Sequence, residues 1–316
     1  MNRRQLFVGV GSTLAFASQS SAYAQVSPDY DRVEIYTPVP EVGTPQERYG
    51  RLIQSANLAL TDCVHALPHP SLMQSDPRRG QSELQAWLTE GSVVRTAVRR
   101  QIDQAGGAPL TIDLRQNEAL ITQQQAIEHL LTAFGLNLNY LQRFAALDPI
   151  SLEREQAWYA DTYFDACTMA MNVQRDLALA QAELVSDPFQ AACLRVLSFS
   201  ADVQVHLAFL AQGNAHGMQL SPRMMGERLD ASADAMLEAL DQAKHSVAVG
   251  SDLADAWESS LVHEARIAQL ANQLGQALIT KNGWSSPGIQ QDLDQLLALY
   301  RQRPTQTVNF AQSFAL

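Results

Sequence analysis

Residues 189–212 read FQAACLRVLSFSADVQVHLAFLAQ, and this stretch decides the fold. On a helical wheel its apolar side chains cover most of the circumference instead of a single face. A helix that is apolar nearly all round is usually buried. We therefore predict that residues 189–212 form a central helix wrapped by the other helices, and that its few polar groups find partners inside the protein.

Seven further segments have a helical period and are bounded by capping residues, prolines or glycines. These segments are 44–67, 82–105, 115–147, 151–185, 221–250, 251–281 and 286–303. Helices joined by turns this short pack antiparallel to their neighbours. The sequence therefore predicts an all-α fold, an antiparallel multi-helix bundle of about eight helices that forms a single domain over residues 44–304.

Two segments of the chain do not fit the helical pattern. Leu110, Ile112 and Leu114 alternate with polar residues, as in a short strand, but no partner strand is evident. The tail over residues 305–316 has no clear prediction.

The first 24 residues have the pattern of a cleaved secretory signal. Arg3 and Arg4 precede an apolar run over residues 6–17, and Ala22-Tyr23-Ala24 supplies the small residues that a signal peptidase recognises. The paired arginines also suit the twin-arginine export route, so both that route and the Sec route stay open. We expect a mature, soluble, periplasmic or secreted protein that begins with an extended leader over residues 25–43.

The composition limits the choice of partners. The chain carries a net charge of −11, and such a charge repels the phosphates of nucleic acids and anionic membranes. Its densest basic cluster, formed by Arg95, Arg99 and Arg100, is expected to be the solvated face of a helix. We therefore expect no nucleic-acid partner.

One ionisable stripe lies on the predicted central helix, where Arg195, Asp202 and His206 fall within about 40° of one another. If Asp202 orients His206, the pair could serve as a general base, a metal ligand or a pH-sensitive site. The simpler interpretation is an intrahelical ion pair without catalytic function, because such pairs four residues apart are common.

Glu264 is the second unusual ionisable residue, because it falls near the middle of an apolar helix face, with His263 at the edge. A carboxylate in that position needs a partner, a metal ion or a proton. The alternative is a helix rotated slightly, so that Glu264 reaches the rim. Asp202, His206 and Glu264 are thus weak catalytic candidates, and Arg195, His206, His263 and Glu264 are candidate ligand-binding residues.

The three cysteines, Cys63, Cys167 and Cys193, all fall on apolar faces. In an antiparallel hairpin of segments 151–185 and 189–212, Cys167 and Cys193 would be some 20 Å out of register. A disulfide could therefore join Cys63 to Cys193 or to Cys167. Three buried, reduced thiols are an equally good interpretation.

Several catalytic and cofactor motifs are missing from the sequence. It has no Cys-x-x-Cys-His, Glu-x-x-His, His-Glu-x-x-His or Gly-x-Ser-x-Gly pattern and no Walker loop. We therefore expect a non-catalytic protein without a cofactor or metal, which binds an envelope protein or a small ligand between its helices. The alternatives are a metal- or cofactor-binding bundle and an enzyme with an unfamiliar site, both using Asp202, His206 and Glu264.

Overall fold

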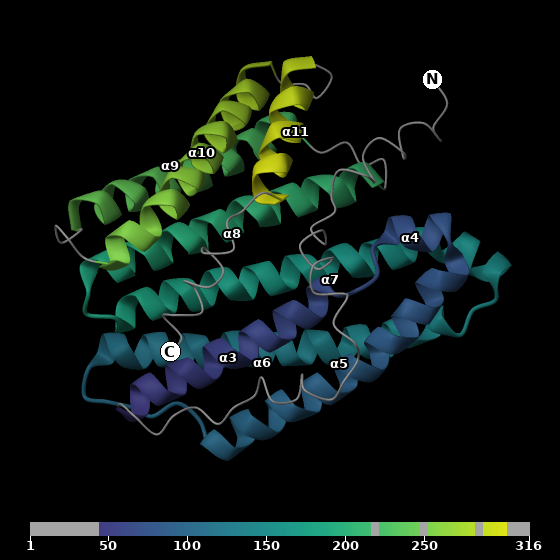
Figure 1. Ribbon diagram of the computed structural model, residues 1–316, viewed down its shortest axis with the longest axis horizontal. Coiled ribbons are helices and arrows are strands. Elements are labelled where there is room, and N and C mark those ends of the chain that lie inside the picture. Colours follow the sequence, from purple (N-terminus) through teal and green to yellow (C-terminus); the bar gives the residue numbers. More distant parts are fainter. Residues whose placement is uncertain (1–43, 216–220, 247–251, 282–286, 302–316) are drawn as a thin grey trace. The chain divides into compact units, whose positions relative to one another are not determined.

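The computed structural model describes residues 44–215, 221–246, 252–281 and 287–301, which form helices joined by short turns (Figure 1). Those ranges contain no strand. The helices are α3 (Pro45–His65), α4 (Pro70–Ser75), α5 (Pro77–Ala105), α6 (Leu114–Ala145), α7 (Pro149–Leu184), α8 (Pro188–Ala215), α9 (Pro222–Ser246), α10 (Asp252–Lys281) and α11 (Pro287–Arg301). The predicted all-α bundle is confirmed. The expected signal peptide (1–24), leader (25–43) and tail (305–316) lie outside the described residues.

Proline marks the start of most of these helices. All except α6 and α10 begin with proline. Proline is tolerated there because backbone N–H groups in the first turn have no acceptor within the helix, so the N–H that proline lacks costs no hydrogen bond. The residue before the proline often caps the helix. Asp187 Oδ1, for example, accepts hydrogen bonds from the backbone N–H of Phe189 at 2.8 Å and of Gln190 at 3.1 Å. The Asp187-Pro188 and Ser221-Pro222 pairs explain why the starts of α8 and α9 are predictable from the sequence. Helix α7 begins at Pro149, two residues before the predicted start at Ser151.

The structure differs from the predicted helices at α4 and α5. The short helix α4 was not foreseen, and α5 begins at Pro77 instead of Ser82. Asp76 caps α5 by accepting a hydrogen bond from the backbone N–H of Arg79. Helix α4 has six residues, too few for a helical period to show in the sequence.

The alternative of a short strand at Leu110, Ile112 and Leu114 is wrong, because these residues lie in the loop before α6 and at its first position. Helix α6 then continues without interruption past Gly135. The guanidinium group of Arg95 lies directly over that glycine, where a Cβ atom would come within 2.6–2.7 Å of it. Gly135 therefore makes room for a side chain of α5 and does not break the helix.

The chain divides into two compact units, and the boundary falls inside α7, between Val173 and Gln174. The N-terminal unit contains described residues 44–173, and the C-terminal unit contains those from 174 to 301. The single domain expected over residues 44–304 is thus organised as two units. No helix in the described ranges combines the length and hydropathy needed to cross a membrane.

In the N-terminal unit, α3, α5 and α6 pack against one another. Their fully buried side chains include Leu60, Leu84 and Ile127. Polar side chains bind the turns to this core. The indole N–H of Trp87 donates a hydrogen bond to the carbonyl oxygen of Cys63 at 2.6 Å. The hydroxyl of Tyr159 donates one to the carbonyl oxygen of Pro68 at 2.6 Å.

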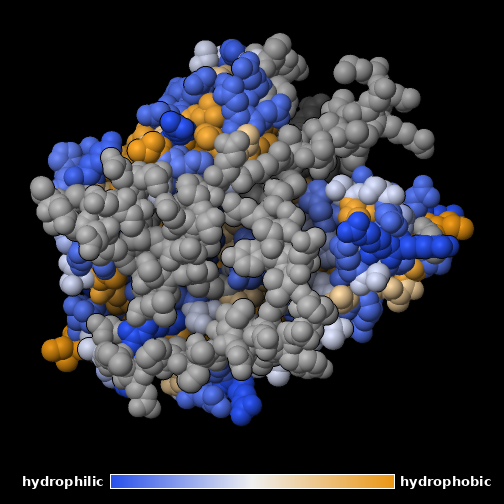
Figure 2. All heavy atoms as spheres, viewed as in Figure 1, coloured by the Kyte–Doolittle hydropathy of each residue, from blue (hydrophilic) through white to orange (hydrophobic). Residues whose placement is uncertain are grey.

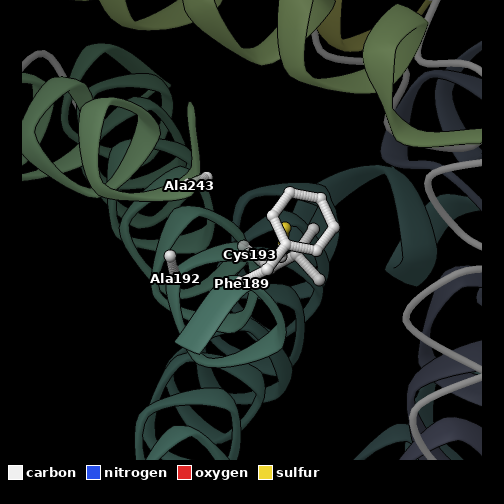
Figure 3. Packing of buried hydrophobic residues seen from close by; sticks show 5 residues of the cluster. Phe189, Ala192, Cys193 and Ala243 are labelled. Carbon is white, nitrogen blue, oxygen red and sulfur yellow. The ribbon is translucent and has the colours of Figure 1, made fainter. Parts of the chain in front are cut away.

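In the C-terminal unit, α8 and α10 both pack against α9. No side chain from Phe189 to Phe209 is exposed, so the prediction of a buried helix holds over those residues. At one end, Phe189, Ala192 and Cys193 of α8 lie with Ala243 of α9 in an apolar cluster (Figure 3). Helices α9 and α10 approach most closely at two glycines, since a Cβ at Gly226 would lie 2.6 Å from the carbonyl oxygen of Gly275.

Candidate functional site

Four polar side chains meet around Asp202, and we call them the Asp202 cluster: Arg175 of α7, Asp202 and His206 of α8, and Ser232 of α9. The guanidinium of Arg175 donates to Asp202 Oδ1 at 2.9 Å. The hydroxyl of Ser232 donates to Asp202 Oδ2 at 2.5 Å, and His206 Nε2 lies 3.4 Å from the same oxygen. Asp202 and His206 face the same side of α8 because they are one helical turn apart.

The electrostatics of the cluster favour an ionised carboxylate. Burial alone would raise the pKa of Asp202, but hydrogen bonds from His206, Ser232 and Arg175 hold it well below its usual range. Burial likewise works against the charge of Arg175, but the neighbouring carboxylates of Asp202 and Asp176 keep its pKa above the ordinary value. A carboxylate with so low a pKa is a weak proton acceptor, which makes it a poor general base.

The order of contacts in the Asp202 cluster does not match nucleophilic catalysis. A serine nucleophile is activated by a hydrogen bond to a histidine, which a carboxylate then orients. Here Ser232 bonds to Asp202 and to the backbone carbonyl of Arg228, so its proton is not directed at His206. The cluster therefore acts as a polar connection between α7, α8 and α9.

A second group, the Glu264 cluster, consists of Ser200, Glu264 and Tyr300 and joins α8, α10 and α11. Glu264 is fully buried, as its position on the apolar face of its helix predicted. It accepts a hydrogen bond from the Ser200 hydroxyl at 2.8 Å. The Tyr300 hydroxyl donates to the Ser200 carbonyl oxygen at 3.0 Å and lies 3.5 Å from its hydroxyl oxygen.

The two clusters lie on different sides of α8. Ser200 and Asp202 are two residues apart, which places them about 200° from each other around the helix axis. Ser200 bonds to α10 and α11, whereas Asp202 bonds to α7 and α9. The body of α8 thus separates Glu264 from the Asp202 cluster.

The other predicted site residues have partners of their own. Arg195 lies 3.2 Å from Glu183 and 3.5 Å from Gln242, and it does not extend the contacts of Asp202. His263 lies within hydrogen-bonding distance of the Leu299 carbonyl oxygen, at 2.9 Å. Arg195, His206, His263 and Glu264 are consequently distributed over separate contacts and do not line one pocket.

All three cysteines are buried and form no disulfide in the structure, so neither of the disulfides considered for Cys63 is present. Burial raises the pKa of Cys167 to about 12, against a smaller lowering effect of its hydrogen bond with Tyr163. Burial also raises the pKa of Cys193. Buried thiols with raised pKa values are unreactive and pack as small apolar side chains.

The loop that joins α5 to α6, residues 106–113, is the most unusual surface feature. Leu110 is 66% exposed, Ile112 104% and Leu114, at the start of α6, 82%. Figure 2 shows a surface that is largely hydrophilic where it is coloured, with several separate hydrophobic patches. We refer to Leu110, Ile112 and Leu114 together as the apolar tip.

Hydrogen bonds fix the backbone of this loop. The side chain of Asn117 pairs with both backbone groups of Thr111, at 2.6 and 2.8 Å. The Thr111 hydroxyl accepts from the backbone N–H of Asp113 at 2.8 Å, and Asp113 in turn caps α6. The exposed side chains are therefore held on an ordered backbone, which bends at Ile112.

A surface cavity of about 490 Å³ lies along α5. Its described lining residues are Arg95, Thr96, Arg99, Arg100, Asp103 and Gln104. Arg99 is engaged by Glu128 at 2.6 Å and by Asp103 at 2.9 Å. Arg100 makes no ion pair within the part of the chain that the structure describes. The basic cluster expected as a solvated helix face thus also borders a hollow.

Comparisons with protein-family models, with curated proteins and with solved structures found no match to this chain.

The sequence alone did not reveal Arg175 or Ser232, although both complete the Asp202 cluster. Each lies on a neighbouring helix, and only the packing of α7 and α9 against α8 brings them to Asp202. The apolar tip did leave a signal, since the alternation at 110–114 places three large aliphatic residues among polar ones. The same alternation also fits a short strand, so the sequence alone does not identify an exposed loop.

Proposed function

We propose that this chain is an exported, non-catalytic helical protein of the bacterial envelope, and that it docks on another envelope component through the apolar tip. The observation that carries the proposal is the exposure of Leu110, Ile112 and Leu114 on a hydrogen-bonded loop. Burying a large aliphatic side chain is worth roughly 1.5–3 kcal/mol. Three such groups on one short loop are thus a substantial source of binding energy.

The fixed loop backbone supports a role in binding. A loop that is already ordered loses little conformational freedom when it binds, so more of the burial energy contributes to affinity. Thr111 and Asn117 provide this order, together with the cap at Asp113.

The two internal clusters support a non-catalytic role. The carboxylates of Asp202 and Glu264 accept hydrogen bonds from side chains of neighbouring helices. Buried polar groups that are paired in this way mainly stabilise one arrangement of helices. The alternative of a metal- or cofactor-binding bundle is less well supported, because its candidate ligands are divided between the two sides of α8.

The export part of the proposal is supported by the sequence pattern over residues 1–24. It has two arginines, a short apolar run and a small-x-small motif in the order expected of a signal peptide.

Fractionation of the native cells tests the proposed function. We expect the wild-type chain to sediment in part with isolated envelopes, and Ile112→Asp to reduce this fraction by about tenfold, because a charge replaces a buried aliphatic contact. Leu136→Asp is the matched control, since Leu136 is 64% exposed on the surface of α6. Equal sedimentation of both variants with the wild type would contradict docking through the tip.

A further inference from the structure

We propose that the acidic leader, residues 25–43, docks on an exposed face of α5 in the same chain. This face, which we call the Arg100 face, lies within about 100° of the helix circumference. It consists of Val93, Thr96, Arg100, Asp103 and Gln104, all of which are exposed. The contact is separate from the apolar tip and its docking role.

The leader joins the described structure beside the C-terminal end of α5. Thr44 is the first described residue, and the side chain of Gln46 donates a hydrogen bond to the carbonyl oxygen of Pro109 at 3.5 Å. Pro109 lies in the loop that follows α5. The Arg100 face begins at Gln104 and extends about 17 Å along the helix to Val93. Nineteen residues in an extended conformation span roughly 60 Å, so the leader is long enough to cover the whole face.

Arg100 is the cation of this face that lacks a partner. Its guanidinium is exposed and makes no ion pair within the described ranges. The neighbouring Arg99, by contrast, is bound by Asp103 at 2.9 Å and by Glu128 at 2.6 Å. With Arg95 included, three arginines and two carboxylates leave this part of the surface with a net charge of +1. An acidic segment that docks here supplies a partner for Arg100.

The leader has the opposite charge. It carries Asp29, Asp31, Glu34 and Glu41 against a single Arg32, a net charge of −3. The whole chain has −11, so most of its surface repels an acidic segment. The basic cluster on α5 is the densest in the chain, which makes it the most favourable place for the leader to lie.

Apolar contacts and backbone stiffness favour the same arrangement. Val93 is 53% exposed, and a hollow of about 490 Å³ lies along this part of α5. The leader contains apolar side chains, among them Val33 and Tyr36, that are suited to covering Val93. Pro38 and Pro40 favour an extended backbone, so the leader loses less conformational freedom when it docks.

Hydrogen–deuterium exchange of the full chain tests the inference. We expect backbone amides between residues 29 and 41 to exchange more slowly than in a synthetic peptide of the same sequence. Arg100→Glu should speed their exchange about fivefold, because it replaces an attraction by a repulsion. Arg154→Glu is the matched control, since Arg154 is an exposed arginine of α7, and it should leave the exchange unchanged. Circular dichroism confirms that each variant is folded.

Charge reversal in the leader separates docking from a general loss of structure. Asp31→Arg/Glu34→Arg alone should speed the exchange, and adding Arg100→Glu should restore the protection, because opposite charges again face each other. Exchange at the peptide's rate in the wild type, equal effects of Arg100→Glu and Arg154→Glu, or no restored protection in the combined variant overturns the inference. Protection that disappears on dilution also overturns it, because the leader then lies on a second copy of the chain.

Discussion

Asp202 connects three helices of the C-terminal unit, α7, α8 and α9, through side-chain hydrogen bonds. It accepts hydrogen bonds from Arg175 of α7 and Ser232 of α9, and it lies beside His206 on its own helix. Within a buried helix an acidic group persists only when its partners compensate for lost hydration. Substitution of Asp202 therefore leaves polar partners on two other helices without their acceptor.

We predict that Asp202→Ala lowers the free energy of unfolding by about 2 kcal/mol, because it leaves Arg175 and Ser232 without their acceptor. Asp176→Ala is the control, since Asp176 binds the same arginine but is more exposed. It should cost less than about 0.5 kcal/mol. Urea unfolding followed by circular dichroism measures both values, and equal losses would argue against the cluster as a structural connection.

His65 should make the protein sensitive to mild acid. Burial lowers its pKa, so near and below pH 6.5 the unfolded chain binds a proton that the folded chain does not. Stability is therefore retained above the unfolded pKa and lost as the pH falls below it. We predict that, as the pH falls from about 7 to about 5 through the ordinary histidine pKa of about 6.5, His65→Gln loses less stability than the wild type. The exposed His245→Gln serves as control, and parallel curves for all three proteins would refute the prediction.

At the scale of elements, the α9–α10 pair depends on two glycines. A Cβ at Gly226 would collide with the backbone of α10, 2.6 Å from the Gly275 carbonyl oxygen. The three atoms nearest to a Cβ at Gly135 all belong to the guanidinium of Arg95, which ends a flexible side chain.

We predict that Gly226→Ala destabilises the protein by about 2 kcal/mol, because the collision outweighs the gain in helix propensity of about 1 kcal/mol. Gly135→Ala should be close to neutral, because Arg95 can move aside. Thermal unfolding compares the two, and a neutral Gly226→Ala would show that α9 and α10 separate at little cost.

The helices were largely predictable from the sequence, for reasons visible at particular residues. Pro188 and Pro222 follow Asp187 and Ser221, and such pairs specify helix starts locally. Helix α4 is not predictable in this way, because its six residues make fewer than two turns and show no helical period. The strand at 110–114 was wrong because the backbone of Thr111 pairs with the side chain of Asn117 and not with another strand.

The candidate site was less predictable, because it depends on contacts between distant parts of the chain. The pairing of Asp202 with His206 follows from their spacing of four residues. The hydrogen bond from Ser200 to Glu264 spans 64 residues, and no local pattern could indicate it. Predicting that the two clusters lie on different sides of α8 would require knowing where α9, α10 and α11 pack against that helix.

At the scale of the whole molecule, the described chain consists of two units that share α7. Their boundary lies between Val173 and Gln174, inside a continuous helix without a glycine or proline nearby. Sequence signals for such boundaries rely on those breaks, so the division inside α7 leaves no mark in the sequence.

The export proposal makes a prediction for the whole chain. Protein recovered from the periplasm should begin at Gln25, because Ala22 and Ala24 supply the small residues before the cleavage site. Ala24→Arg should block cleavage and leave the full-length chain in the membrane fraction. Mass spectrometry of the intact protein distinguishes the two forms. Recovery of the uncleaved wild-type chain from the cytoplasm would refute export.

The docking role of the apolar tip is the central claim, and site-specific photo-cross-linking in native cells tests it most directly. A photoreactive amino acid is placed at position 112 in one variant and, in another, at position 136, an apolar site on α6 that is 64% exposed. We predict that illumination couples the chain to an envelope lipid or protein from position 112 but not from position 136. Absence of adducts from position 112, or equal adducts from both positions, would contradict the claim.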